Sequence, residues 1–290
     1  MLIQPRDVKL LASIHVHRFQ TSEHLHHLFF RGRSLRAAQA RLKELLDASF
    51  IERTYLMPPV DGGRPRLRPL YSLARAGANV VADLLRVPVA AVAHTTAAKR
   101  IGYEHLLHEL VVTDFLVSAD VVLDGTGCNV VVLRDHALRS ALSRYRAHPA
   151  GHRAVVPDAA ITITGGALPS PTTFYLEVVH AGVKGGNTRL VEKLDHYVGL
   201  NRGGYFANVF GHRRVRGVVV VSPSADRVEN LRALAARRMR QGHRFVWFAA
   251  APRHLSRTHP PTTFTPETLA TTDFVDVAGD HHRFGLDAFH

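Results

Sequence analysis

The stretches VVPDAAITIT (residues 155–164) and FYLEVV (residues 174–179) decide the fold of the second half of the chain. Both are short runs rich in apolar and β-branched residues, a composition typical of buried β-strands. Beyond them, strand-like and helix-like runs alternate along the sequence. Strands are expected at 215–221 and 245–249, and helices at 188–200 and 226–239. This alternation predicts an α/β domain with a mixed sheet and helices on both faces.

The region just before these strands is expected to form a long helix and an antiparallel meander. Residues 100–119 carry Leu and Val at helical spacing and predict the helix. The apolar runs 121–123 and 129–133 flank Asp124-Gly125-Thr126-Gly127, which predicts a hairpin. Residues 135–145 then predict a basic surface helix inserted after this hairpin.

The first third of the chain predicts short helices followed by a hairpin. Ser34 is a suitable N-cap for a helix whose apolar stripe holds Ala38 and Leu42, with polar residues on the opposite face. The expected helices are 7–16, 22–29, the one after Ser34, and a closing helix at 74–85, and the hairpin pairs strands 50–55 and 70–73. This is the element order of a winged helix-turn-helix.

Two domains are therefore expected. The segments are a winged helix-turn-helix at 1–86, a linker at 87–98, a mixed-sheet domain at 99–250 and an unassigned C-terminal extension at 251–290.

The charge of the chain points to a polyanionic partner. It has 290 residues, with 37 Lys and Arg against 24 Asp and Glu, and is 46% hydrophobic, which excludes a disordered protein. Residues 1–99 hold 15 Lys and Arg against 7 Asp and Glu, so the excess is concentrated there. We expect double-stranded DNA as the partner. The alternative is an arginine-rich composition that reflects high-GC coding alone.

The predicted winged helix supplies the candidate DNA contacts. Its third helix is expected to enter the major groove, and the arginines of the hairpin tip are expected to reach nearby phosphates. The candidate DNA-binding residues are Arg31, Arg33, Arg36, Gln39, Lys43, Arg64, Arg66 and Arg68. The structural alternative is a small helical bundle whose basic face is merely solvated.

A pair of carboxylates marks the candidate chemistry of the second domain. Asp158 follows Pro157 at the start of one predicted strand, and Glu177 lies inside the next. Carboxylates on neighbouring strands can together bind Mg2+ or Mn2+, which prefer oxygen ligands and activate water against a phosphodiester. Glu109 is a candidate third ligand, and Lys193, with Lys184 second, is the candidate cation that stabilises the phosphate.

The order of these residues resembles a known nuclease core. A helix with Glu109, a meander, Pro157-Asp158, Glu177 and a helix with Lys193 are similar to the PD-(D/E)xK, or restriction-endonuclease-like, fold. Over residues 5–248, the chain resembles the replication-relaxation family of plasmids and mobile elements. That resemblance implies a relaxase-like DNA nickase acting in plasmid replication or conjugative transfer. The last motif of the superfamily places a Lys two residues after the Glu, where this chain has Val179.

The second domain therefore has two interpretations. In the first it is an endonuclease, with Asp158, Glu177 and Lys193 as catalytic residues and Mg2+ or Mn2+ bound by Glu109, Asp158 and Glu177. In the second it has no chemistry and no cofactor, and serves DNA binding or dimerisation in a replication, transfer or transcription regulator. A purely structural alternative gives Asp158 a turn-capping role and pairs a buried Glu177 with Arg189. Whether the protein forms a homodimer stays open.

Other motifs carry weaker indications. The His24-Leu25-His26-His27 run has no nearby Cys, so a zinc site is not predicted. The helical spacing of Tyr197 indicates a core-facing ring rather than a nucleophile. The glycine-rich loop from Gly182 to Asn187 lacks the pattern of an ATP-binding loop. With a single Cys128, no visible secretory signal and no span of about 18 apolar residues, a cytoplasmic protein without membrane contact is expected.

Overall fold

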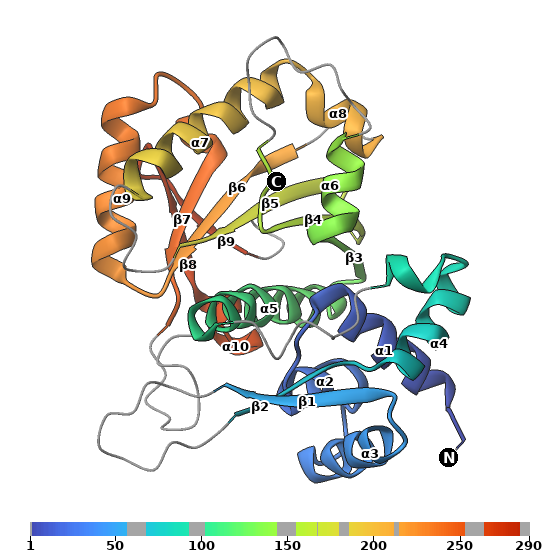
Figure 1. Ribbon diagram of the computed structural model, residues 1–290. Coiled ribbons are helices and arrows are strands. Elements are labelled where there is room, and N and C mark those ends of the chain that lie inside the picture. The colour runs from blue at the N-terminus through green and yellow to red at the C-terminus, as the bar shows by residue number, and fades with distance from the viewer. Residues whose placement is uncertain are drawn as a thin grey trace. The chain divides into compact units, whose positions relative to one another are not determined.

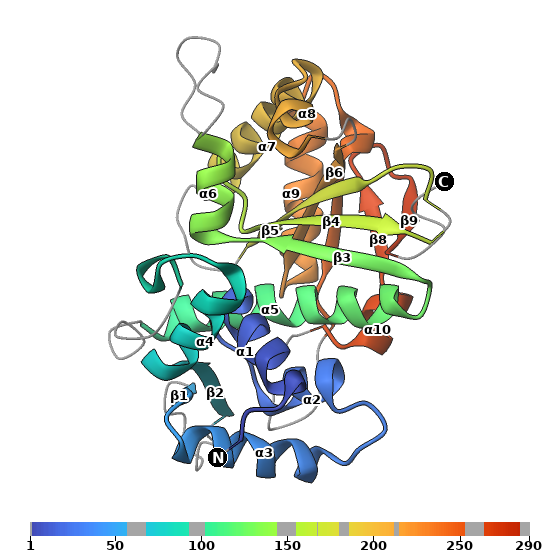
Figure 2. The ribbon, with the colours of Figure 1, turned by 90° about the vertical axis from the view of Figure 1, so that its right-hand side faces the viewer.

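The computed structural model describes two compact units (Figures 1 and 2). The N-terminal unit runs to Val117 and the sheet unit begins at Ser118, so the division falls within helix α5 (Tyr103–Asp124). The described residues are 2–56, 68–92, 102–143, 155–166, 168–179, 186–211, 215–252 and 264–284. Among them, no helix combines the length and the apolar character needed to cross a bilayer.

The N-terminal unit has the predicted element order. Its elements are α1 (Pro5–His17), α2 (Ser22–Phe29), α3 (Leu35–Asp47), β1 (Ile51–Leu56), β2 (Arg68–Leu73), α4 (Arg75–Leu85) and the 3-10 helix η1 (Val89–Ala91). Thr21 and Ser34 cap α2 and α3 by accepting hydrogen bonds from backbone N–H groups in the first turn. Strands β1 and β2 pair antiparallel, with Ile51 opposite Leu73. The predicted helices and hairpin are therefore confirmed for the described residues.

A large apolar cluster stabilises this unit. Ala38, Leu42 and Leu45 of α3 are fully buried against residues of α1, α2, α4 and the hairpin. Gly77 lets α4 approach the turn before β1, because a Cβ at this position would lie 2.1 Å from the carbonyl oxygen of Phe50. The packing fixes the rotation of α3, so its polar stripe faces outward.

The described residues of the sheet unit include one sheet of seven strands. They are β3 (Cys128–Leu133), β4 (Ala159–Gly165), β5 (Thr172–Val178), β6 (Val215–Ser222), β7 (Val246–Ala250), β8 (Asp273–Asp276) and β9 (His281–Arg283), adjacent in that order. Strands β5, β6 and β7 pair parallel, and every other neighbouring pair is antiparallel. The fold is thus mixed α/β, with N-terminal helices before a mixed sheet, as predicted. Figure 2 shows β3, β4 and β5 running side by side.

Helices cover one face of this sheet with a continuous core. The helices of the unit after α5 are α6 (Asp135–Ser143), α7 (Gly186–Arg202), α8 (Tyr205–Phe210), α9 (Ala225–Arg238), the 3-10 helix η3 (His243–Phe245) and α10 (Pro266–Thr271). Residues of α6 to α9 pack on Tyr175, Val218 and Phe248 from the strands, and α7 and α9 lie over the same face in Figure 1. Every residue of β5 is buried, which explains its continuous apolar run.

One expectation for this unit is wrong, and two features of the unit were not predicted. Residues 121–123 continue helix α5 instead of forming a strand, and β3 pairs with β4. Helix α8 was not expected. The extension 251–290, left unassigned from the sequence, contributes α10, β8 and β9, and the two strands extend the sheet beyond β7.

Candidate active site and nucleic-acid interface

Asp158 is held against the end of β5 by the backbone. It directly precedes β4, and its N–H donates to the carbonyl oxygen of Leu176 at 3.0 Å. Its Oδ2 in turn accepts a 2.8 Å hydrogen bond from the N–H of Val178. These two bonds straddle Glu177, so the carboxylates of Asp158 and Glu177 belong to one site. The register of β4 and β5 brings Asp158 and Glu177 close together, which agrees with their predicted proximity.

The Glu177 carboxylate is buried and bound by two side chains of α7. Glu177 is 5% exposed. Lys193 Nζ lies 2.6 Å from Oε1 and 2.8 Å from Oε2, and the Tyr197 hydroxyl donates to Oε1 at 2.6 Å. Lys193 Nζ also donates to the carbonyl oxygen of Val156 at 3.0 Å. We call Asp158, Glu177, Lys193 and Tyr197 the acid–lysine cluster.

The acid–lysine cluster has unusual protonation equilibria. Burial, and secondly the negative charge of Asp158, raise the pKa of Glu177 to about 7, although Lys193 and the Tyr197 hydroxyl act in the opposite direction. Burial and the neighbouring Glu177 raise the pKa of Tyr197 well above its ordinary value, so Tyr197 stays a neutral donor. A carboxyl group that titrates near neutrality beside a cation is suited to hold or release a proton.

Two features of the cluster differ from what the sequence suggested. The partner of the buried Glu177 is Lys193 and not Arg189, which is exposed on α7. Tyr197 does face the core, stacking on Tyr175, but its hydroxyl also reaches Glu177. The signal for this contact was present in the sequence, because residues four apart on a helix, such as Lys193 and Tyr197, share one face.

Two further residues were predicted to belong to the site, Glu109 and Lys184. Glu109 belongs to the N-terminal unit, where its carboxylate lies 3.7 Å from Arg18 and 3.8 Å from His105. Lys184 lies outside the described residues, as does most of the loop from Gly182, whose last residues, Gly186 and Asn187, begin α7. Within the described parts of the chain, no three His, Cys, Asp or Glu side chains are placed to share a metal ion. The role of Glu109 as a third ligand stays a prediction.

Helix α3 presents an exposed polar stripe. Arg36, Gln39 and Lys43 recur at helical spacing and are all exposed. Lys43 lies 3.7 Å from Asp47, an exposed pair on the same helix that is weak in water. Arg41, the other cation of this helix, is turned inward and anchors α3 to α1 through Asp7. The side chains predicted to read DNA are therefore accessible.

The other residues predicted to contact DNA either precede α3 in the sequence or belong to the hairpin, which the structure describes only in part. Arg31 and Arg33 are exposed in the turn between α2 and α3, where Gly32 adopts a positive φ of 77°. Arg64 and Arg66 fall outside the described residues. Arg68 is the first residue of β2, but the structure does not describe its side chain. Arg53, on β1, is an exposed cation that was not among the predicted contacts.

A buried histidine–aspartate pair was not foreseen. His24 Nε2 and Asp114 Oδ1 form a short contact between α2 and α5, and both residues are buried. The Nδ1 atom of His24 accepts from the N–H of Thr21, which leaves the proton of the neutral ring on Nε2. His24 is thus a helix-capping core residue. Because ninety positions separate His24 from Asp114, no local sequence pattern predicts that they form a pair.

Comparison with known proteins assigns the chain to a family. Neither the curated proteins nor the solved structures include a significant match to it. The family described as replication-relaxation matches residues 11–215, which is well over half of the chain and includes α3 and the whole acid–lysine cluster. The chain belongs to the replication-relaxation family.

Proposed function

We propose that the protein binds double-stranded DNA through helix α3 and nicks it at the acid–lysine cluster with the help of Mg2+ or Mn2+. Membership of the family indicates a role in the replication or relaxation of a plasmid or other mobile element. The observation that carries the proposal is the contact of Lys193 Nζ with the buried Glu177 carboxylate, beside Asp158.

The carboxylates of the cluster suit a divalent cation. Asp158 raises the pKa of Glu177, which means that two negative charges repel each other in a site of low polarity. A divalent cation held by both carboxylates would relieve this repulsion, and Mg2+ commonly uses one or two carboxylates together with water and substrate phosphate. When bound, the ion would supply Lewis-acid polarisation of a phosphoryl oxygen and a more acidic water.

Each residue of the cluster then has a role. Asp158, fixed by the Val178 N–H, and Glu177 would hold the cation. Tyr197 orients Glu177 through its hydroxyl. The Lys193 side chain is 29% exposed, so its ammonium group has access to a phosphate in solvent while it remains next to Glu177. We assign Lys193 the stabilisation of the negative charge that develops on the scissile phosphate.

The stripe on α3 would bring the duplex to the protein. Arg36 and Gln39 are exposed and carry the donors that recognise guanine and adenine edges in the major groove, and Lys43 would contact a phosphate. Ser34 caps the amino end of α3, in keeping with a helix presented to the groove by its first turns. The wing arginines Arg64, Arg66 and Arg68 are proposed as phosphate contacts on the sequence prediction alone.

A second candidate function is a DNA-binding regulator without catalysis. It is favoured by the hydrogen bonds that already occupy both oxygens of Glu177, one from Tyr197 and others from Lys193. Val179, rather than a Lys, follows Glu177 by two residues, which also suits a cluster that is purely structural. In this case the second unit would support duplex binding or dimerisation.

A plasmid-nicking assay separates the two candidates. Supercoiled plasmid is incubated with wild-type protein in Mg2+ or Mn2+, with Glu177→Gln as the test variant and Arg189→Gln, at an exposed position of α7, as the matched control. If the protein is a nickase, the wild type and the Arg189 variant should produce open circular plasmid. The Glu177 variant should produce none, and a chelator should abolish the activity. If no protein nicks the plasmid in either metal while all retain it, the regulator replaces the nickase.

A further inference from the structure

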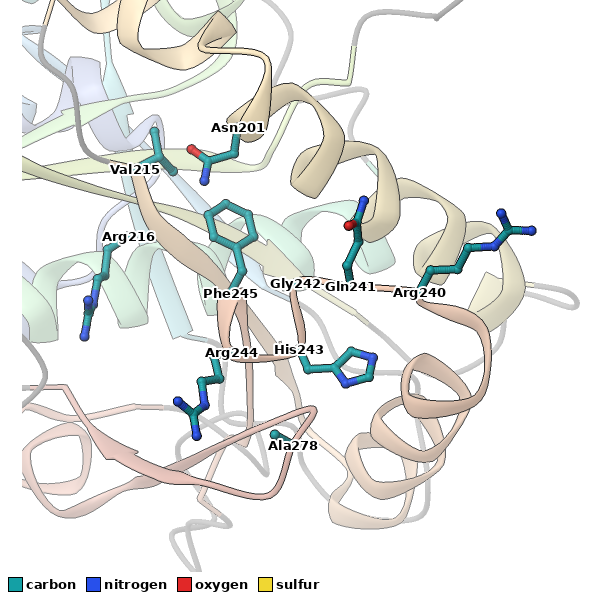
Figure 3. A pocket seen from close by; sticks show the side chains of 10 residues that line it. All are labelled: Asn201, Val215, Arg216, Arg240, Gln241, Gly242, His243, Arg244, Phe245 and Ala278. Atoms are coloured by element: carbon teal, nitrogen blue, oxygen red, sulfur yellow. The ribbon is translucent and has the colours of Figure 1, made fainter.

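We propose that a second, arginine-lined pocket in the sheet unit binds a nucleotide of single-stranded nucleic acid. The pocket has a volume of about 580 Å3 and lies where α7, β6, η3 and the β8–β9 turn meet (Figure 3). Its lining includes Asn201, Arg216, Arg240, His243, Arg244 and Phe245. None of these residues belongs to the acid–lysine cluster or to the N-terminal unit.

The charge of the pocket selects an anion. Three arginines and one histidine line it, and its described lining contains no carboxylate. Arg244 Nε lies 3.0 Å from Asp280 on the rim, but both side chains are more than half exposed, so this pair yields readily to a phosphate. Guanidinium groups bind phosphate oxygens through two parallel hydrogen bonds, which favours a phosphate over a simple halide.

An aromatic ring accompanies this charge. Phe245 packs partly on the core of the sheet unit and still contributes to the lining of the pocket. In Figure 3 its ring points towards Asn201 and Val215, whereas Arg216 and Arg244 extend the opposite way. Single strands are held by aromatic rings on which bases stack, together with cations that bind the phosphates, and here Phe245 and the arginines line one pocket. Asn201 also lines the pocket, and its amide carries a donor and an acceptor for the edge of such a base.

The pocket is formed by rigid backbone. A Cβ at Gly217 would lie 2.6 Å from the carbonyl oxygen of Phe245, so only glycine allows β6 to pass this close to η3. Gly242 has a φ of 80°, and a Cβ there would lie 2.5 Å from the Val198 side chain. The N–H of Val277 donates to the carbonyl oxygen of His243 at 3.1 Å and ties the β8–β9 turn to η3. The recess thus exists before a ligand binds, which lowers the entropic cost of binding.

The shape favours a single strand over a duplex. A recess of about 580 Å3 accommodates a group of the size of one nucleotide. In a duplex the bases are stacked on both sides and present only backbone and groove edges, so no base would be free to meet Phe245. The pocket therefore suits a strand whose bases are unstacked.

Fluorescence anisotropy with a labelled oligothymidylate of about 15 nucleotides tests the proposal on the full-length protein. The test variant is Arg240→Ala/Arg244→Ala, and the matched control is Arg237→Ala/Arg238→Ala, two exposed arginines of α9 outside the pocket lining. We expect the test variant to lose about tenfold or more in affinity and its salt slope to fall by about 0.7 per lost phosphate contact. Equal losses in both variants would mean general electrostatic attraction and would overturn the proposal.

A second variant separates stacking from charge. Phe245→Leu keeps an apolar side chain on the core and is expected to weaken oligothymidylate binding about fivefold or more, with an unchanged salt slope. Unchanged affinity, or full displacement of the oligonucleotide by an equal concentration of free thymidine monophosphate, would overturn the assignment to a strand. The proposed function is tested separately from this inference. Arg36→Ala should weaken duplex binding and leave oligothymidylate binding intact.

Discussion

Replacing Lys193 with Met removes the cation that neutralises the buried Glu177. The methionine side chain fills a similar volume, so the principal change is electrostatic. Without Lys193, the pKa of Glu177 must rise above its value of about 7, because Lys193 lowers it in the wild type. The variant protein therefore keeps Glu177 protonated to a higher pH than the wild type does.

The magnitude follows from proton linkage. A group whose pKa is raised by folding stabilises the fold below its unfolded pKa and loses that contribution as the pH rises through the folded pKa. For the wild type the loss levels off once the pH has passed the Glu177 pKa of about 7, whereas for Lys193→Met it continues to higher pH. The difference in unfolding free energy should thus be small near about pH 6 and grow by up to about 1.4 kcal/mol per pH unit above pH 7.

Urea denaturation provides the assay. The only tryptophan of the chain, Trp247, is buried in β7 and reports the unfolding of the sheet unit. Arg189→Met, on the exposed side of α7, controls for the loss of a positive charge, and Lys193→Met/Glu177→Gln removes the titrating group. A difference between Lys193→Met and the wild type that stays constant from about pH 6 to about pH 8.5 would refute the reasoning.

Three further predictions concern single contacts. Tyr197→Phe removes a hydrogen bond that lowers the pKa of Glu177, so carbon-13 NMR should show the Glu177 carboxyl titrating above pH 7, and an unchanged midpoint would contradict the contact. Leu42→Ala leaves a cavity in the N-terminal core and should cost about 2–5 kcal/mol in denaturant unfolding, whereas a neutral effect would contradict the packing of α3. Gly217→Ala should destabilise the sheet unit by about 1–3 kcal/mol, since its methyl group would lie 2.6 Å from the Phe245 carbonyl oxygen, and an unchanged urea midpoint would show that η3 moves freely.

The elements of the N-terminal unit were predictable because local signals agree there. Ser34 caps α3, and Ala38 and Leu42 form the stripe that becomes its buried face. The inward turn of Arg41 was not predictable, because its partner Asp7 lies on a different helix. Charge patterning alone does not separate a cation that anchors two helices from one that faces solvent.

In the sheet unit, the sequence-based predictions were wrong or incomplete where contacts with other elements, rather than local propensity, determine the secondary structure. The apolar run 121–123 suits a helix or a strand equally, and in the structure it continues the helix whose residues 110–119 are all buried. Strands β8 and β9 have four and three residues, and it is the ladder from β7 that orders them. Such short strands carry little periodicity of their own.

The candidate site was predictable in its members and not in its contacts. The order of Asp158 and Glu177 on consecutive strands is enough to expect them together, because β4 and β5 are neighbours. The contact of Lys193 with Glu177 depends on how α7 is rotated over β5, which no local pattern specifies. The pocket around Phe245 was not foreseen, since it joins segments from Asn201 to Ala278.

The salt dependence of duplex DNA binding tests the central claim most directly. Anisotropy is measured with a labelled duplex of about 30 base pairs over a range of salt concentrations, for the wild type and for Arg36→Ala/Lys43→Ala. The account predicts that the affinity of the wild type falls steeply with salt, by about 0.9 log units per phosphate contact and decade, and that the variant binds more weakly with a shallower slope. Duplex binding that is insensitive to salt, or identical in the two proteins, would contradict it.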